Sequence, residues 1–148
     1  MKIRNVCKLV ALILLSVLNG QEYNNVRVKQ DGLSINILYD MEGKLYRGDK
    51  VALVYSIDDG KNYSIILDAD GDIGANVLPG SNNEVNWLLI NKDFIIGKII
   101  NFRIITIPEG MVYVDGGNYM RSSISSSNKE VSSHAVELGS FLMDETEV

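Results

Sequence analysis

The sequence is poor in the residues that staple small folds and that build common active sites. Its 148 residues include one cysteine, one histidine, one tryptophan and two prolines. The cysteine, Cys7, lies in a segment that we expect to be removed, so no disulfide would stabilise the mature fold. His134 has no second histidine or cysteine for a metal site and no evident paired nucleophile. Most common catalytic arrangements are therefore excluded, and neither a G-x-S-x-G motif nor a glycine-rich phosphate loop is present.

The first twenty residues predict a secretory signal peptide. Lys2, Arg4 and Lys8 precede an apolar run at residues 9–18, and polar residues follow at once. We expect cleavage after Gly20; an uncleaved membrane anchor is the alternative. Cys7 cannot be a lipoprotein acceptor because it precedes the apolar run. The sequence thus predicts export to the periplasm, the cell surface or the medium.

The charge balance is acidic. The chain has 14 Lys and Arg against 19 Asp and Glu, a formal net charge of −5. Removal of the signal peptide takes away three cations and no acidic residue, which leaves −8. Such a chain argues against nucleic acid or an anionic membrane surface as partner, and leaves an unidentified protein or glycan.

Residues 21–107 predict a mainly β domain. Short runs rich in Val, Ile, Leu and Tyr are separated by turn clusters of Gly, Asp and Asn. Apolar and polar residues alternate from Leu33 to Tyr39, as in a half-buried antiparallel strand. Trp87 lies among apolar neighbours and is expected in the core rather than on a sugar-binding platform. We expect an antiparallel β-sandwich of immunoglobulin or fibronectin type.

Residues 56–63, SIDDGKNY, resemble the Asp-box hairpin of sialidase-like propellers. Asp58 can accept hydrogen bonds from backbone N–H groups of the turn, Gly60 can take positive φ, and Tyr63 can pin the returning strand. A propeller needs several repeated blades, whereas this motif occurs once. A stabilised hairpin within the sandwich is therefore expected.

Three aspartates at alternate positions, Asp68, Asp70 and Asp72, are a candidate calcium site. An EF-hand is excluded, because Ile73 and Pro79 stand where that loop needs Gly and Glu. A tight turn carrying three carboxylates could still hold a calcium ion weakly. The alternative is a plain solvated turn.

Residues 108–148 form a separate segment. Pro108 ends the strand pattern, a new apolar run begins at Met111, and a Ser-rich loop follows. The last residues alternate around an expected turn at Gly139. Fewer than forty residues remain after Pro108's turn, which is too few for an independent core.

This segment carries an ordered motif, M-V-x-V-x-G-G-x-Y, a polar loop, then E-x-x-x-H-x-V-x-L-x-x-F-x-M-x-x-x-E-V. It resembles the opening of the formylglycine-generating enzyme, or sulfatase-modifying factor, family. The matching positions are Met111, Val112, Val114, Gly116, Gly117, Tyr119, Glu130, His134, Val136, Leu138, Phe141, Met143, Glu147 and Val148. The sequence departs from the family where Arg121 and Ser122 replace Met-Gly and where Ser132 replaces Pro.

The resemblance implies that residues 108–148 are the truncated start of an α+β, C-type-lectin-related domain. In that family the active-site cysteines and metal ligands come later, so the given chain is expected to be a non-catalytic, N-terminal piece of a longer exported protein without a cofactor beyond the calcium candidate. The parent could be an oxidase or a structural relative in a secretion or gliding apparatus. The preceding sandwich is similar to modules of exported Bacteroidetes-type proteins. The alternative is a stand-alone secreted binding module for a glycan or protein.

Overall fold

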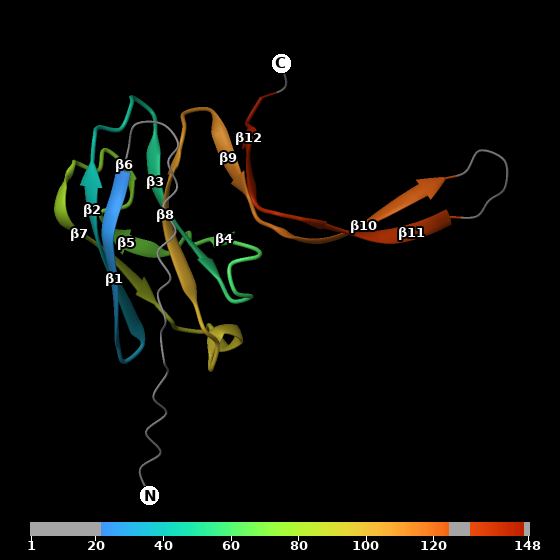
Figure 1. Cartoon of the computed structure of the whole chain (residues 1–148), viewed down its shortest axis with the longest axis horizontal. Helices are drawn as coiled ribbons and strands as arrows, with labels where there is room; N and C mark the ends of the chain where they lie inside the picture. The colour runs from blue at the N-terminus through green and yellow to red at the C-terminus, as the bar shows by residue number, and fades with distance from the viewer. Residues whose placement is uncertain (1–21, 125–130, 147–148) are drawn as a thin grey trace, which may run out of the picture.

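The computed structural model describes residues 22–124 and 131–146; within these ranges, side chains at 122–124 and 131–132 are not described. Several residues considered above lie outside these ranges: the expected signal peptide with Cys7, Glu130, Glu147 and Val148. Within the ranges, every regular element is a strand except one short 3₁₀ turn, η1 (Asp93–Ile95) (Figure 1). No helix in this part of the chain is long and apolar enough to cross a membrane. The expectation of a mainly β, antiparallel protein is confirmed.

Two antiparallel sheets make up residues 22–107. The first has four strands in the order β1 (Glu22–Asp31), β2 (Ser34–Glu42), β7 (Gly80–Leu88) and β5 (Ala69–Gly71). The second is centred on β3 (Lys50–Ser56), which pairs along its whole length with β8 (Asn101–Ile107). β8 lies on one side of β3. On the other side, β3 pairs with two short strands, β4 (Ser64–Ile65) and β6 (Gly74–Ala75).

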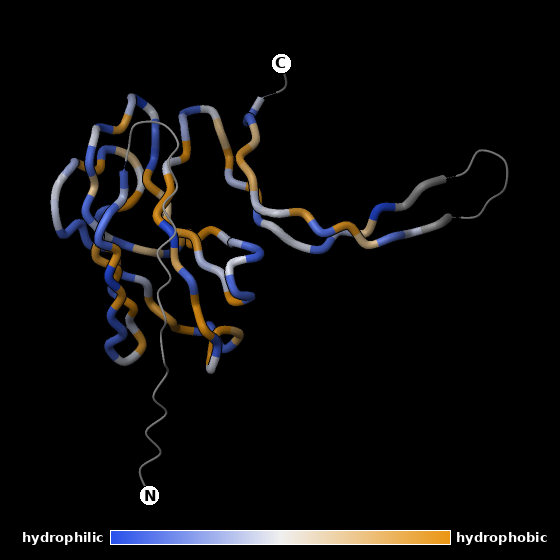
Figure 2. The backbone as a smooth tube through the Cα atoms, viewed as in Figure 1, coloured by the Kyte–Doolittle hydropathy of each residue, from blue (hydrophilic) through white to orange (hydrophobic). Residues whose placement is uncertain are grey.

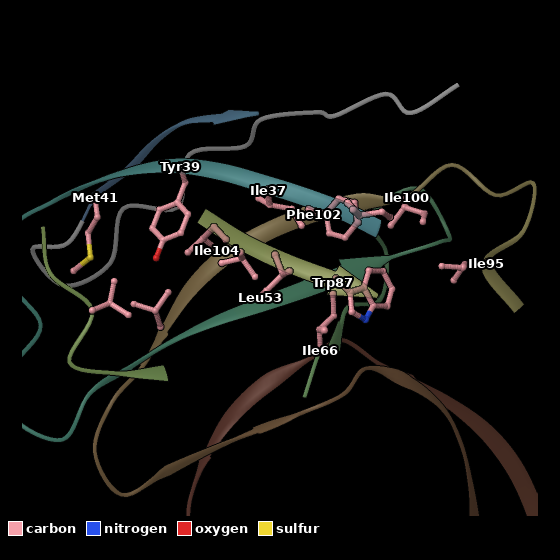
Figure 3. Close-up of a cluster of buried hydrophobic side chains, with 14 residues drawn as sticks. Ile37, Tyr39, Met41, Leu53, Ile66, Trp87, Ile95, Ile100, Phe102 and Ile104 are labelled. Carbon is pink, nitrogen blue, oxygen red and sulfur yellow. The ribbon is translucent and has the colours of Figure 1, made fainter. Parts of the chain in front are cut away.

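The core lies between these two sheets. β2 alternates buried and half-buried residues, as expected of a strand with one face inward. Figure 3 shows the side chains that the two sheets contribute: Ile37, Tyr39 and Met41 of β2, Trp87 of β7, Leu53 of β3, and Phe102 and Ile104 of β8. Trp87 is 1% exposed, which confirms its place in the core. The indole nitrogen still finds a partner, donating to Asp68 Oδ1 over 3.0 Å.

Residues 111–124 and 131–144 form one long two-stranded ribbon. Its strands are β9 (Met111–Val114), β10 (Gly117–Ile124), β11 (Val131–Leu138) and β12 (Phe141–Asp144). The register is continuous, because Val114 pairs with Phe141 and Gly117 pairs with Leu138 across a break of two residues on each side. The turn expected at Gly139 was wrong: the chain runs on from β11 into β12 there. Beyond the break, β10 and β11 extend away from the sandwich as an arm (Figure 1).

β3 is buried on both of its faces. Leu53 faces the core, while the outward Ala52 and Val54 are also buried. Arg103, which pairs with Val54 across the sheet, places its guanidinium 4.0 Å from the ring centre of Tyr63. The outer face of this sheet is therefore covered, on the side where the Asp-box hairpin and the start of the ribbon lie.

Candidate functional site

The Asp-box hairpin forms the hydrogen bonds that its sequence predicts. Ser56 Oγ donates to Asp58 Oδ1 over 2.6 Å and accepts from the Gly60 N–H over 2.9 Å. Asp58 Oδ1 also accepts from the Asn62 N–H over 3.0 Å, and its Oδ2 accepts from Asn62 Nδ2 over 2.8 Å. Gly60 has φ +82°, and Tyr63 is buried. The turn is thus fixed by its own side chains.

This network changes the acidity of Asp58. Desolvation by burial raises the pKa of its carboxyl, but hydrogen bonds from the Asn62 backbone, Ser56 and the Asn62 side chain outweigh burial and lower it to about 2. The carboxylate is therefore ionised at neutral pH. An ionised acceptor makes the stronger hydrogen bonds that hold the turn.

The returning half of the hairpin holds the start of the ribbon; we call this contact the joint. The Tyr63 carbonyl accepts from the Tyr113 hydroxyl over 3.2 Å and from the Gly116 N–H over 3.4 Å. Asp115, the residue before Gly116, adds a third bond: its Oδ1 accepts from the Ile65 N–H over 3.0 Å. Three bonds, between segments about fifty residues apart in sequence, therefore anchor the ribbon to the sandwich.

Gly116 is at the tightest point of the joint. A Cβ built on it would lie 2.7 Å from Asn62 Oδ1 and 2.8 Å from the Ser140 nitrogen, closer than real Cβ contacts. Only glycine therefore lets the Asp-box hairpin and both ribbon strands meet there. Gly117, by contrast, has only the Tyr119 ring edge near it, at 3.9 Å. The sequence motif marked both glycines; the structure distinguishes them.

The other motif residues lie along the ribbon, apart from Glu147, which is outside the described residues. Tyr119 pairs with Val136, and its hydroxyl donates to the Asp115 carbonyl over 2.9 Å. His134 pairs with Arg121 on the exposed arm. Phe141 opens β12 opposite Val114. These residues share a ribbon rather than converging on a reaction centre.

The ribbon leaves apolar side chains in solvent. Three consecutive residues of β12, Phe141, Leu142 and Met143, are each 39–51% exposed, although they alternate between its two faces. Tyr119, Met120 and Leu138 are likewise exposed on the arm, where apolar and polar residues follow one another closely (Figure 2). In the described chain, this surface has nothing packed over it that would bury it.

The three candidate calcium ligands lie in and beside strand β5 rather than in a tight turn. Asp68 accepts from Trp87 Nε1 and from Lys92 Nζ, and these hydrogen bonds, that from Lys92 first, lower its pKa. Asp72 Oδ2 accepts from the Glu84 N–H over 2.8 Å. Alternate residues of a strand are about 7 Å apart, too far for carboxylates to surround one ion easily. Among the described residues no group of three acidic, His or Cys side chains is placed to hold a metal; calcium binding here stays a prediction.

A hollow of about 530 Å³ opens at one end of the sandwich, between the β2–β3 and β6–β7 connections. Its lining residues are Lys44, Leu45, Tyr46, Arg47, Gly48, Asp49, Ala75, Asn76, Val77, Leu78 and Pro79. The sequence patterns described above did not single out the first of these loops. The signal that could have found it is an aromatic and a cation, Tyr46 and Arg47, inside a short turn bounded by Gly43 and Gly48.

Comparisons with known proteins assign no family to the chain. No family model, curated protein or solved structure matches it. Function must therefore be inferred from the ribbon, its joint and the hollow.

Proposed function

We propose that this chain is the N-terminal, non-catalytic part of an exported protein, in which an immunoglobulin-like sandwich carries the first β-hairpin of a formylglycine-generating-enzyme-like domain. The observation that carries the proposal is the ribbon: the motif of that family lies along it in continuous register, with its apolar side chains exposed. A two-stranded hairpin is only marginally stable by itself, and exposed apolar side chains mark a surface for packing. We therefore expect the rest of such a domain to pack on the ribbon.

The immunoglobulin-like assignment is supported by strand order. Immunoglobulin domains have a sheet in the order A, B, E, D and a second sheet that includes C and F. With β1, β2, β3, β5, β7 and β8 taken as A, B, C, D, E and F, the first sheet has this order and β3 pairs with β8. The Asp-box hairpin follows strand β3 directly, so the joint is built on the centre of the second sheet.

The role proposed for the sandwich is to orient the ribbon. The three hydrogen bonds of the joint and the close approach at Gly116 set the direction in which the ribbon leaves. Since the resembled family places its active-site cysteines and metal ligands after this motif, the proposal expects no oxidation of a sulfatase peptide by residues 1–148.

The gene itself provides the test. Sequencing past the Val148 codon should find an open frame that begins Thr-Asn and encodes the rest of the domain, whose cysteines then decide between an oxidase and a structural relative. A stop codon directly after Val148, or oxidation of a sulfatase peptide by the 148-residue chain, would overturn the proposal.

A further inference from the structure

Asp49 holds the β2–β3 loop, which lines one side of the hollow, in place through hydrogen bonds. This side chain is 8% exposed and accepts from the Tyr46 N–H over 3.3 Å and from the Glu109 N–H over 3.2 Å. The Asp49 N–H in turn donates to the Tyr46 carbonyl over 3.1 Å. The loop is thereby tied to itself and to the β8–β9 connection. A ligand bound here would not have to order the loop first, which removes a cost of binding.

Large side chains that line the hollow are mostly exposed to solvent. Tyr46 is 71% and Leu78 is 77% exposed, and they come from the two different loops that flank the hollow. Arg47 is exposed and makes no ion pair or hydrogen bond within the described residues. Asp49 is occupied by the loop, and the cations that line the hollow are Arg47 and Lys44. The Glu109 carboxyl group lies beside Gly48, next to Arg47 in the sequence.

We propose that the hollow binds a short saccharide that carries a carboxylate or sulfate group. The Tyr46 ring and the apolar side chains of Leu78 and Pro79 line the hollow. They offer apolar surfaces against which the C–H faces of sugar rings can pack. The Arg47 guanidinium matches the paired oxygens of a carboxylate or sulfate. Asn76, with φ +66°, adds an amide for hydroxyl groups. This site is independent of the ribbon and of its proposed role.

The acidic chain limits the length of the ligand. With a formal net charge of −5 for the whole sequence, a long polyanion would be repelled by the rest of the surface. Binding should therefore favour a short oligosaccharide and weaken as salt screens the attraction to Arg47.

The test is an NMR titration of the whole chain with trigalacturonate and a sulfated galactose oligosaccharide, with neutral galactotriose as comparison. We expect saturable shifts at residues 44–49 and 75–79 with at least one acidic probe, at least tenfold tighter than with galactotriose. Arg47→Gln should weaken binding at least tenfold and Tyr46→Ala about tenfold. Lys98→Gln, which removes the same charge beyond η1 and away from the hollow, should change it less than twofold.

Circular dichroism would check that each variant remains folded. The proposal is overturned if neither acidic probe shifts these residues or if galactotriose binds as tightly. It is also overturned if Arg47→Gln and Lys98→Gln have equal effects, since that would reduce the interaction to net charge.

Discussion

The sandwich and the ribbon are both built from apolar strand-forming residues, but they use them differently. In β2 the inward residues are almost completely buried against the facing sheet, whereas in β12 three consecutive apolar residues stay partly in solvent. In the sandwich a second layer covers the apolar face, whereas in the described chain no layer buries these apolar side chains of the ribbon. Strand-forming residues therefore decide that a segment is extended, while a covering layer decides whether it is stable by itself.

Truncation of the core should produce the largest effect. Leu53→Ala removes a fully buried side chain between the two sheets and should lower the free energy of unfolding by about 2–5 kcal/mol. Leu142→Ala on the ribbon removes the same atoms from a half-exposed position and should change it by less than about 0.5 kcal/mol. Chemical denaturation of both variants measures the difference; equal losses would show that the ribbon is as buried as the core.

A methyl group at the joint should have the next largest effect. Gly116→Ala forces Asn62 or the Ser140 backbone to move and should destabilise the docked ribbon by about 1–3 kcal/mol. The matched control is Gly117→Ala, where the added carbon meets only an aromatic ring edge at 3.9 Å. Amide exchange of β9 would report the loss. If both variants behave alike, the close approach at Gly116 does not hold the ribbon.

Acid should loosen the Asp-box hairpin at low pH. The pKa of Asp58 is lowered to about 2, below the value of about 3.9 for an unfolded aspartate, so its stabilising contribution is fully present above about pH 4. It should be lost as pH falls from about 4 to about 2. Asp58→Asn should be less stable at pH 7 and lose this part of the pH dependence.

The control for this prediction is Asp59→Asn, a change at the exposed neighbour in the same turn. Denaturation at a series of pH values compares the two variants with the parent chain. A pH profile that Asp58→Asn leaves unchanged would contradict the role given to this carboxylate.

Removal of the arm should have the smallest effect on the sandwich. Replacement of residues 118–137 by a two-residue turn takes away strands beyond the joint, whose described side chains are exposed except for the half-buried Val136. The free energy of unfolding should change by less than about 0.5 kcal/mol, as for other surface changes. A loss of several kcal/mol would mean that the arm is part of the sandwich's core.

Local sequence patterns predicted much of the sandwich. The alternation from Leu33 to Tyr39 identified β2 and its buried face, and the spacing within SIDDGKNY identified the hydrogen-bonded turn. Both features depend on residues close in sequence, where pleat and turn geometry leave few choices. Trp87 was placed in the core for a similar reason, from its apolar neighbours.

Features that depend on pairing between distant residues could not be predicted in the same way. Gly139 suggested a turn, but it lies in a two-residue break between β11 and β12, across which the pairing keeps one register from Leu138–Gly117 to Phe141–Val114. The segment of Asp68 and Asp72 suggested a turn, but pairing of β5 with β7 extends it. The hollow beside Tyr46 and Arg47 depends on the hydrogen bonds of Asp49 to Tyr46 and to the distant Glu109, which no local sequence pattern predicts.

Amide hydrogen exchange of the whole chain tests most directly the claim that the sandwich is stable by itself and the arm is not. We predict that amides of β2, β3, β7 and β8 exchange only through global unfolding, while those of β10 and β11 exchange with almost no protection. Amides of β9, held by the joint, should lie between. Protection of β10 and β11 equal to that of β2 would contradict the account.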